Sequence, residues 1–199
     1  MEDALKVLTR ILNRRLVDQL LASGAISPNQ WGFLRGRGST IPYHILLSAL
    51  EDAAERKLPI RSGTYDICRA FDSIEPWSLQ DAYRGAGITP RSMELLGALD
   101  GTGTAQVLSA AGLSGVFNRE RGVPQGETLS PIKFVLWLEA FLQHVSRAYP
   151  NAGHTMRPPA GDGEGDPEEA RVCTLALADD VAVVTTTSPC STTQSCCQM

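Results

Sequence analysis

Two short apolar segments separated by a pair of aspartates constrain this chain most strongly. Residues 172–178 and 181–186 are rich in Val, Leu and Ala, and Asp179-Asp180 lies between them. Apolar segments of this length joined by two polar residues are typical of a tight antiparallel hairpin. The sequence therefore predicts two paired strands with both carboxylates at the turn. Taken alone, the pair is also explained as an ordinary hairpin turn, because Asp is a common turn residue.

Composition excludes several classes of protein. The chain has 199 residues, of which 43% are hydrophobic and 20% charged, as in an ordinary globular domain. The longest apolar run, residues 134–145, contains Glu139, Gln143 and His144, which argues against a membrane span. The five cysteines show no CxxC spacing, which argues against a disulfide framework or a zinc site. Because the N-terminus lacks a secretory signal, we expect an intracellular protein without a membrane partner.

The net charge of −4 is unevenly distributed. Residues 1–61 carry a net charge of +3, and residues 62–199 carry −7. A basic first part and an acidic second part suit a protein that holds a polyanion in one place and metal ions in another. Ordinary surface variation explains the same asymmetry on composition alone.

Hydrophobic periodicity predicts a mixture of helices and short strands. The expected helices cover residues 3–22, 41–56, 76–85, 90–99 and 131–149. Further strands are expected over residues 60–67, 104–109 and 115–121. The Gly-, Pro- and acid-rich stretch 150–170 is expected to be a long surface loop.

A third carboxylate, Asp66, is expected near the end of the strand over residues 60–67. Two strands of this kind, side by side in one sheet, would bring three oxygen-rich groups to one edge. Such hard ligands suit Mg²⁺ or Mn²⁺ rather than zinc. Two ions of this kind can activate an attacking hydroxyl and stabilise a leaving pyrophosphate.

A further candidate element is the sequence Arg-Gly-Val-Pro-Gln-Gly at residues 121–126, followed by Leu-Ser-Pro and the apolar helix. Gly126 permits a close approach of the backbone. Thr128 or Ser130 can cap the helix, and Pro131 suits its first turn. The same residues are also explained as a simple turn from a strand into a helix.

Taken in order, these elements resemble a known family. Residues 66–72 (DICRAFD), 121–126 with Leu129-Ser130-Pro131, and 178–180 (ADD) resemble the three central palm motifs of reverse transcriptases. Residues 30–40 (QWGFLRGRGST) are similar to the fingers motif that precedes them. The type is nearest to non-LTR retrotransposons, with group II intron enzymes as more distant relatives. The resemblance covers about residues 5–186.

The resemblance implies an α/β (α+β) fold, a polymerase palm with a small antiparallel sheet backed by helices. It implies partial fingers over residues 1–60, a palm over residues 61–187 and a disordered tail over residues 188–199. An upstream fingers strand and the thumb that relatives carry are not recognised in the sequence.

The resemblance also implies roles for the acidic residues. Asp66, Asp179 and Asp180 match the catalytic and metal-binding carboxylates, which in relatives hold two Mg²⁺ or Mn²⁺ ions. Asp66 and Asp179 would bridge the two ions, whereas the carboxylate of Asp180 can point aside.

For the nucleotide, the resemblance implies a second set of residues. Phe71 matches the aromatic residue under the incoming sugar, where it would exclude a 2′-hydroxyl; a core aromatic is the alternative. Gln125 and Gly126 would line the nucleotide pocket. Arg37 and Arg35 would grip the triphosphate, with the register between them left open.

The implied function is RNA-directed DNA synthesis, in which a primer 3′-hydroxyl attacks a dNTP. The implied partners are an RNA template, a DNA primer and dNTPs, and the nucleus is a plausible compartment; the oligomeric state is not indicated. One alternative is a catalytically inactive retroelement fragment with at most weak nucleic-acid binding, so enzyme status stays open. Another is an unrelated metal-dependent phosphotransfer enzyme, which leaves Phe71 and Gln125-Gly126 unexplained.

Overall fold

The computed structural model describes residues 2–100, 104–110, 112–118, 120–124, 126–156 and 170–186. The chain divides into two compact units, each made of two segments. The helical unit consists of residues 1–27 and 68–141, and the sheet unit of residues 28–67 and 142–199. This division differs from the fingers and palm boundaries expected from the sequence, which stay a prediction. The expected tail over residues 188–199 lies outside the described residues.

The sheet unit is built around three antiparallel strands. Strand β1 (Ile60–Asp66), β9 (Asp180–Thr186) and β8 (Thr174–Leu177) lie in the order β1-β9-β8. Leu177 pairs with Asp180, so Ala178 and Asp179 alone form the turn between β8 and β9. The predicted strand that ends near Asp66 is confirmed, and so is the predicted hairpin, but only one of the two aspartates lies in its turn: Asp180 is already the first residue of β9, and Ala178 takes its place in the turn.

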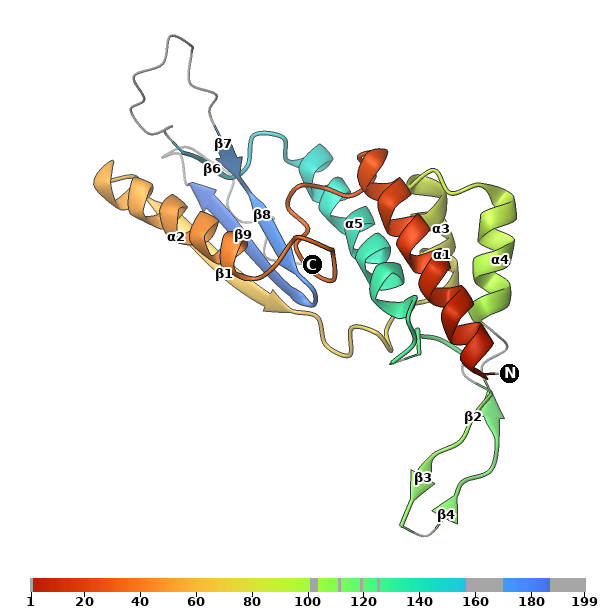
Figure 1. Cartoon of the computed structure of the whole chain (residues 1–199). Helices are drawn as coiled ribbons and strands as arrows, with labels where there is room; N and C mark the ends of the chain where they lie inside the picture. Colours follow the sequence, from red (N-terminus) through yellow and green to blue (C-terminus); the bar gives the residue numbers. More distant parts are fainter. Residues whose placement is uncertain are drawn as a thin grey trace. The chain divides into compact units, whose positions relative to one another are not determined.

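One helix covers this sheet and encloses a small core. Helix α2 (Thr40–Glu55) lies along the strands (Figure 1). Val172, Leu175 and Val184 form the buried cluster, and Ile45 and Leu46 of α2 pack against it. Burial of these side chains attaches α2 to the sheet, because removal of apolar surface from water is the main favourable term in folding.

The expectation of a loop over residues 150–170 is partly wrong. Strand β6 (His154–Met156) lies within it and pairs with β7 (Ala170–Val172), which begins at its last residue; residues 157–169 lie outside the described part. This hairpin could not be recognised from the composition of the segment, because its strands are only three residues long and β6 contains a histidine. That histidine, His154, is only 1% exposed, so it acts as a core residue of the hairpin.

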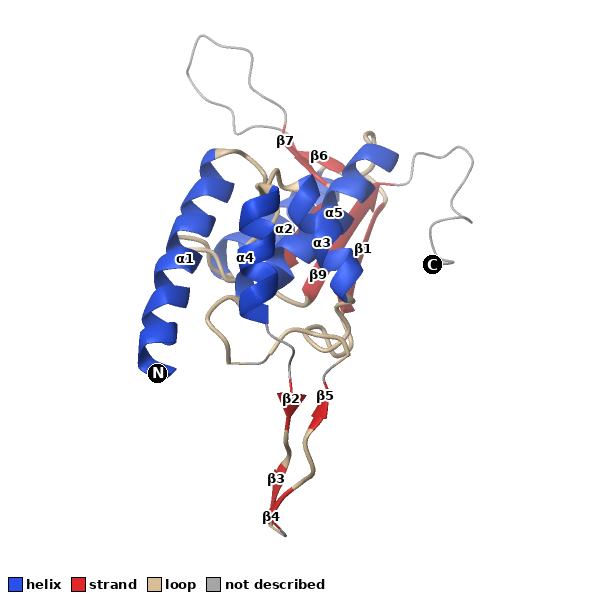
Figure 2. Cartoon of the chain, turned by 90° about the vertical axis from the view of Figure 1, so that its right-hand side faces the viewer, coloured by secondary structure: helices blue, strands red, loops and turns tan. Residues whose placement is uncertain are grey.

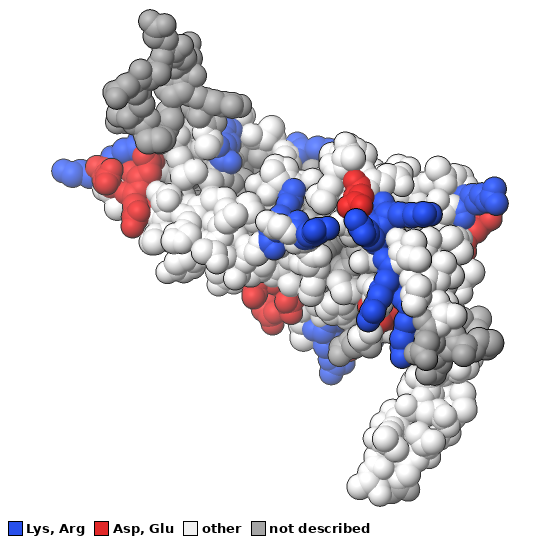
Figure 3. Space-filling view, viewed as in Figure 1, with Lys and Arg blue, Asp and Glu red and all other residues white. Residues whose placement is uncertain are grey.

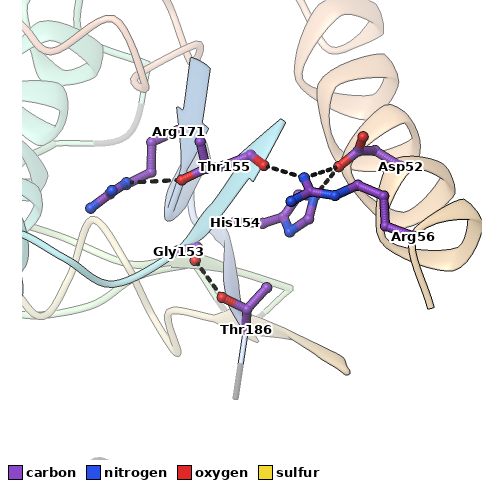
Figure 4. Close-up of polar contacts among 7 residues, drawn as sticks. All are labelled: Asp52, Arg56, Gly153, His154, Thr155, Arg171 and Thr186. Atoms are coloured by element: carbon purple, nitrogen blue, oxygen red, sulfur yellow. Dashed lines mark hydrogen bonds and ion pairs between the residues drawn. The ribbon is translucent and has the colours of Figure 1, made fainter. Parts of the chain in front are cut away.

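A polar cluster ties the β6–β7 hairpin to α2 (Figure 4). His154 Nε2 lies 2.6 Å from Asp52 Oδ2, and Arg56 Nη1 lies 3.0 Å from the same oxygen. The Arg56 guanidinium also donates to the Thr155 carbonyl at 2.9 Å. At the other side of β6, Thr186 Oγ1 donates to the Gly153 carbonyl at 3.0 Å. These bonds connect α2, β6 and the end of β9.

Four helices dominate the helical unit (Figure 2). They are α1 (Glu2–Ala22), α3 (Pro76–Gly85), α4 (Pro90–Asp100) and the first part of α5 (Ser130–Ala148), which crosses the unit boundary. All four predicted helices are confirmed within two residues at each end. The buried face of α5 includes Phe134, Val135 and Leu138.

The leucine stripe of α1 is buried along only part of its length. Leu20 is 1% exposed, whereas Leu5 and Leu8 are 51% and 45% exposed. The periodicity correctly predicted the helix. Which turns of its apolar face are covered depends on the neighbours, and periodicity carries no information on them.

The predicted strands over residues 104–109 and 115–121 form an interrupted hairpin, which projects from the helices of its own unit (Figure 2). Strand β2 (Thr104–Ala105) pairs with β5 (Phe117–Asn118), and β3 (Leu108–Ser109) pairs with β4 (Gly112–Leu113). Between the pairs, the Val107 N–H donates to Ser114 Oγ at 2.9 Å. The Ser114 side chain thus replaces a ladder bond, which explains the interruption.

None of the helices in the described residues combines the length and apolarity needed to cross a membrane.

Candidate active site

The sheet register brings the predicted acidic residues together. Asp66, the last residue of β1, is the direct cross-strand partner of Asp180, the first residue of β9. Directly opposite side chains leave the same face of a sheet, with Cβ atoms about 4.5–5.5 Å apart. Asp179 occupies the adjoining turn, and its carbonyl accepts the Ile67 N–H at 3.1 Å. The three aspartates therefore occupy one end of the three-stranded sheet.

This end of the sheet carries uncompensated negative charge. Asp66 and Asp180 are exposed and Asp179 is half-buried, and none of them forms an ion pair with a described residue. Like charges directly opposite each other destabilise a sheet. A bound cation would relieve this repulsion.

The donor types fit a hard divalent cation, because carboxylate oxygens are the ligands that Mg²⁺ and Mn²⁺ prefer. Among the residues that the structure describes, no three His, Cys, Asp or Glu side chains are placed to hold a metal ion together. The backbone register places the three aspartates at adjoining positions, and their side chains do not converge on one point in this structure.

The two predicted phosphate-binding arginines belong to the same sheet unit but have different surroundings. Arg37 donates through Nη1 to the Gln30 carbonyl, and its guanidinium lies 5.8 Å from the centre of the Trp31 ring. Arg35 is exposed. Arg37 therefore contributes to the order of its own loop, whereas the Arg35 side chain is accessible to a ligand.

Phe71 lies in the helical unit, where it stacks on a core residue. Its ring centre lies 5.2 Å from that of Phe134, with an angle of 22° between the planes. Phe71 is half-buried and Phe134 is 0% exposed. At least one face of the Phe71 ring therefore packs in the core, against Phe134, as the alternative interpretation expected. Its role in sugar selection stays a prediction.

Part of the glycine-rich turn docks onto the backbone beside Phe71. The Val123 N–H donates to the Phe71 carbonyl at 2.9 Å, and the Gly122 N–H donates to the Ile74 carbonyl at 2.8 Å. Gly126 has φ +85, and no described atom lies within 4 Å of the position of a Cβ there. This glycine is required by its backbone conformation, and it leaves open space. Gln125 lies outside the described residues.

Gly122 permits this docking, and its replacement is expected to be costly. A Cβ at Gly122 would lie 2.9 Å from Asp72 Cα, and φ is +82. We expect Gly122→Ala to lower the free energy of unfolding by about 2–4 kcal/mol, from strain and steric overlap together. Gly87→Ala is the matched control, because Gly87 has φ +72 but open space around it. Urea unfolding should show a loss of only about 1 kcal/mol for the control; equal losses would exclude the overlap.

Sequence reasoning missed the contacts that hold the turn of Ala178 and Asp179. Gln30 is 0% exposed and forms a bridge with Ala176 of β8, although it is polar and lies in a loop. Gly32 approaches the backbone of Ala178 so closely that a Cβ would overlap with it. The sequence singled out this segment only through its similarity to the fingers motif and a glycine flanked by two aromatic residues, Trp31 and Phe33, and neither feature predicts a partner on β8.

Part of the basic character of the first part of the chain lies on α1. Its exposed cations are Lys6, Arg10, Arg14 and Arg15. Basic side chains gather over this helix in the space-filling view (Figure 3). The first three follow at steps of four residues, which places them along one side of a helix. This surface of the helical unit is suited to a polyanion.

Strands that end in adjoining aspartates, together with a glycine-rich turn that leads into an apolar helix, define a polymerase palm. The family model described as reverse transcriptase (RNA-dependent DNA polymerase) matches residues 3–199, and the chain belongs to this family. The resemblance of its motifs to reverse transcriptases is therefore confirmed. Enzymes of this family use divalent metal ions.

Two related proteins are encoded by retrotransposable elements of the R2 type. The chain is 28% identical over 179 residues to the Retrovirus-related Pol polyprotein from type-1 retrotransposable element R2 of Popillia japonica. It is 32% identical over 139 residues to that from type-2 retrotransposable element R2DM of Drosophila melanogaster. These matches cover 89% and 69% of the chain, but it spans only 23% and 13% of the relatives' lengths. The similarity to non-LTR retrotransposon enzymes is thus confirmed.

Solved structures confirm the fold. Telomerase from Candida tropicalis, in complex with the TWJ fragment of telomeric RNA, matches 87% of the chain with a TM-score of 0.58 and 15% identity. Apo telomerase from the same species, truncated from its C-terminal domain, matches 89% with a TM-score of 0.56 and 18% identity. The chain spans 28% and 34% of these structures. The expected mixture of helices and small antiparallel sheets is that of a polymerase palm.

Proposed function

We propose that this reverse transcriptase domain catalyses RNA-directed DNA synthesis. The observation that carries the proposal is the register that pairs Asp66 with Asp180, with Asp179 in the adjoining turn. In the reaction, the primer 3′-hydroxyl oxygen bonds to the α-phosphorus of a dNTP. The bond from that phosphorus to the bridging oxygen breaks, pyrophosphate leaves, and the hydroxyl proton passes to solvent.

The three aspartates are the residues that we propose to hold two Mg²⁺ or Mn²⁺ ions. The chemistry that such ions supply is activation of the attacking hydroxyl and stabilisation of the leaving pyrophosphate. The contribution of the chain is to place three carboxylates at one rigid sheet end. Backbone pairing over the seven residues of β1 supplies that rigidity.

Arg35 is the arginine that we propose to bind the triphosphate, since its side chain is exposed. A guanidinium can bind two phosphate oxygens at once. Arg37, which contacts Gln30 and Trp31, would fix the loop that presents Arg35. Phe71, Gln125 and Gly126 keep their predicted roles at the sugar and the base within this proposal.

The proposed partners are an RNA template, a DNA primer and dNTPs. The exposed cations of α1 support a nucleic-acid partner, because neutralisation of phosphates by Lys and Arg dominates such binding. We also propose that the protein acts inside the cell, in the nucleus. Binding that weakens steeply with salt is the expected signature.

Incorporation of labelled dTTP on an oligo(dT)-primed poly(rA) template, with Mg²⁺ or Mn²⁺, tests the proposal. The paired variant is Asp179→Ala, checked by circular dichroism for equal folding. Incorporation by the natural chain that falls at least about a hundredfold in the variant would support the enzyme. A folded natural chain that incorporates nothing would instead support the inactive fragment with a palm fold.

A further inference from the structure

The segment from Asn29 to Gly32 runs along β8, the strand that leads into the catalytic turn. The Ala176 N–H donates to the Asn29 carbonyl at 2.9 Å, and the Trp31 N–H donates to the Ala176 carbonyl at 2.7 Å. Gln30 and Ala176 form a parallel bridge. Since β9 pairs with the other edge of β8, this segment covers the edge that the sheet leaves open. We call residues 29–32 the brace.

The brace ends against the turn itself. A Cβ on Gly32 would overlap with the Ala178 nitrogen and lie 2.7 Å from Ala178 Cα. Both are backbone atoms, so no side-chain movement can make room. Gly32 has no positive φ that would explain a glycine there. The absence of a side chain therefore serves the close approach alone.

The turn that Gly32 contacts is strained. Ala178, its first residue, has φ +55, a conformation that costs an L-residue with a Cβ about 1–2 kcal/mol. Such a conformation persists only where the surroundings enforce it. The brace supplies part of that enforcement, since Gly32 lies directly on Ala178 and two backbone bonds hold the neighbouring Ala176.

Gln30 connects Gly32 to the rest of the brace and the brace to the arginine loop. Gln30 is 0% exposed, and its Oε1 accepts the Gly32 N–H at 3.1 Å. Its backbone carbonyl accepts a bond from Arg37. A single buried side chain thus orients Gly32. The same residue also connects the brace to the loop of Arg35 and Arg37.

We infer that Gly32 is a positioning residue for catalysis, because it sets the position of the turn that carries Asp179. Through its close contact with Ala178, it fixes where the Asp179 carboxylate lies relative to Asp66. Through Gln30, it also fixes the arginine loop relative to the carboxylates. This inference rests on the proposed function, because the turn matters for turnover only if the aspartates are catalytic.

Comparison of Gly32→Ala with Gly38→Ala tests the inference. Gly38 lies in the same loop without positive φ, and no atom lies within 4 Å of its Cβ position, so the two substitutions differ in the available space. We expect Gly32→Ala to lower kcat about a hundredfold, as a displacement of about 1 Å does, with KM for dTTP changed far less. Gly38→Ala should change both within about twofold.

Binding of Mn²⁺, followed by electron paramagnetic resonance, gives a readout that does not require turnover. Gly32→Ala should bind Mn²⁺ more weakly than Gly38→Ala, because the displaced turn moves Asp179 away from Asp66. A purely structural role would lower the melting temperature without this selective change.

Each outcome decides the inference. Equal kcat and equal Mn²⁺ affinity for the two alanine variants would overturn it while leaving the proposed function intact. If the natural chain incorporates no nucleotide, the proposed function fails for this chain, and the Mn²⁺ comparison alone decides the role of Gly32. Should Gly32→Ala fail to fold, Gln30→Met replaces it, because this substitution removes the Oε1 acceptor. We expect it to lower kcat about tenfold, and a loss of less than about threefold would overturn the inference.

Discussion

Replacement of Asp66 by Asn is expected to lower kcat for nucleotide incorporation at least about a hundredfold, while the chain stays folded. The substitution keeps the size of the side chain and removes its charge. Because Asp66 faces Asp180 across the sheet, the variant loses one of two directly opposed carboxylates. A divalent cation at this site would then lose one negatively charged ligand, which the neighbouring aspartates cannot replace.

The same substitution is expected to stabilise the fold slightly when EDTA removes divalent cations. Relief of the repulsion with Asp180 should contribute about 0.3 kcal/mol, a small value because both side chains are exposed and screened by solvent. Thermal unfolding at low salt measures this gain. At about 1 M NaCl, where the Debye length is about 3 Å, the gain should disappear.

Glu94→Gln is the matched control for Asp66→Asn, because it removes an exposed carboxylate of α4 in the helical unit. Incorporation by the control should stay within about twofold of the natural chain. Undiminished incorporation by Asp66→Asn would contradict the assignment of the site. An unchanged melting temperature in EDTA would contradict only the argument from repulsion.

The largest effect on stability is expected for Phe134→Ala. Phe134 is 0% exposed on α5, and its ring stacks on Phe71 at 5.2 Å and lies 5.8 Å from the Trp137 ring. Truncation leaves a cavity between two aromatic rings in addition to the lost transfer free energy. We expect the free energy of unfolding to fall by about 3–5 kcal/mol, as measured by urea denaturation.

Phe141→Ala is the control on the same helix, since Phe141 is 48% exposed. Its loss should stay below about 1 kcal/mol, because little apolar surface is returned to water. Similar losses for both variants would show that Phe134 is not the packing centre of this unit. In a variant that stays folded, such as Phe134→Leu, altered discrimination between dTTP and its ribonucleotide would link the stack to the predicted role of Phe71.

Much of the local structure could be predicted from the sequence, because it depends on short-range pattern. The helices follow from apolar periodicity, and the hairpin around Asp179 follows from two apolar runs with a two-residue gap. The β6–β7 hairpin could not be predicted. His154 is buried there through a bond to Asp52, a residue about a hundred positions away in the chain.

The candidate site divides in the same way. The sequence by itself determined the identity of the aspartates, the strand ends on which they lie and the family motifs that contain them. Only the tertiary structure decided that Asp66 faces Asp180, because register between strands more than a hundred residues apart depends on long-range pairing. It also decided that Gly32 lies on the Ala178 turn and that Arg37 contacts Gln30. Such contacts depend on how closely two backbones approach, which the pattern of residues along one segment does not encode.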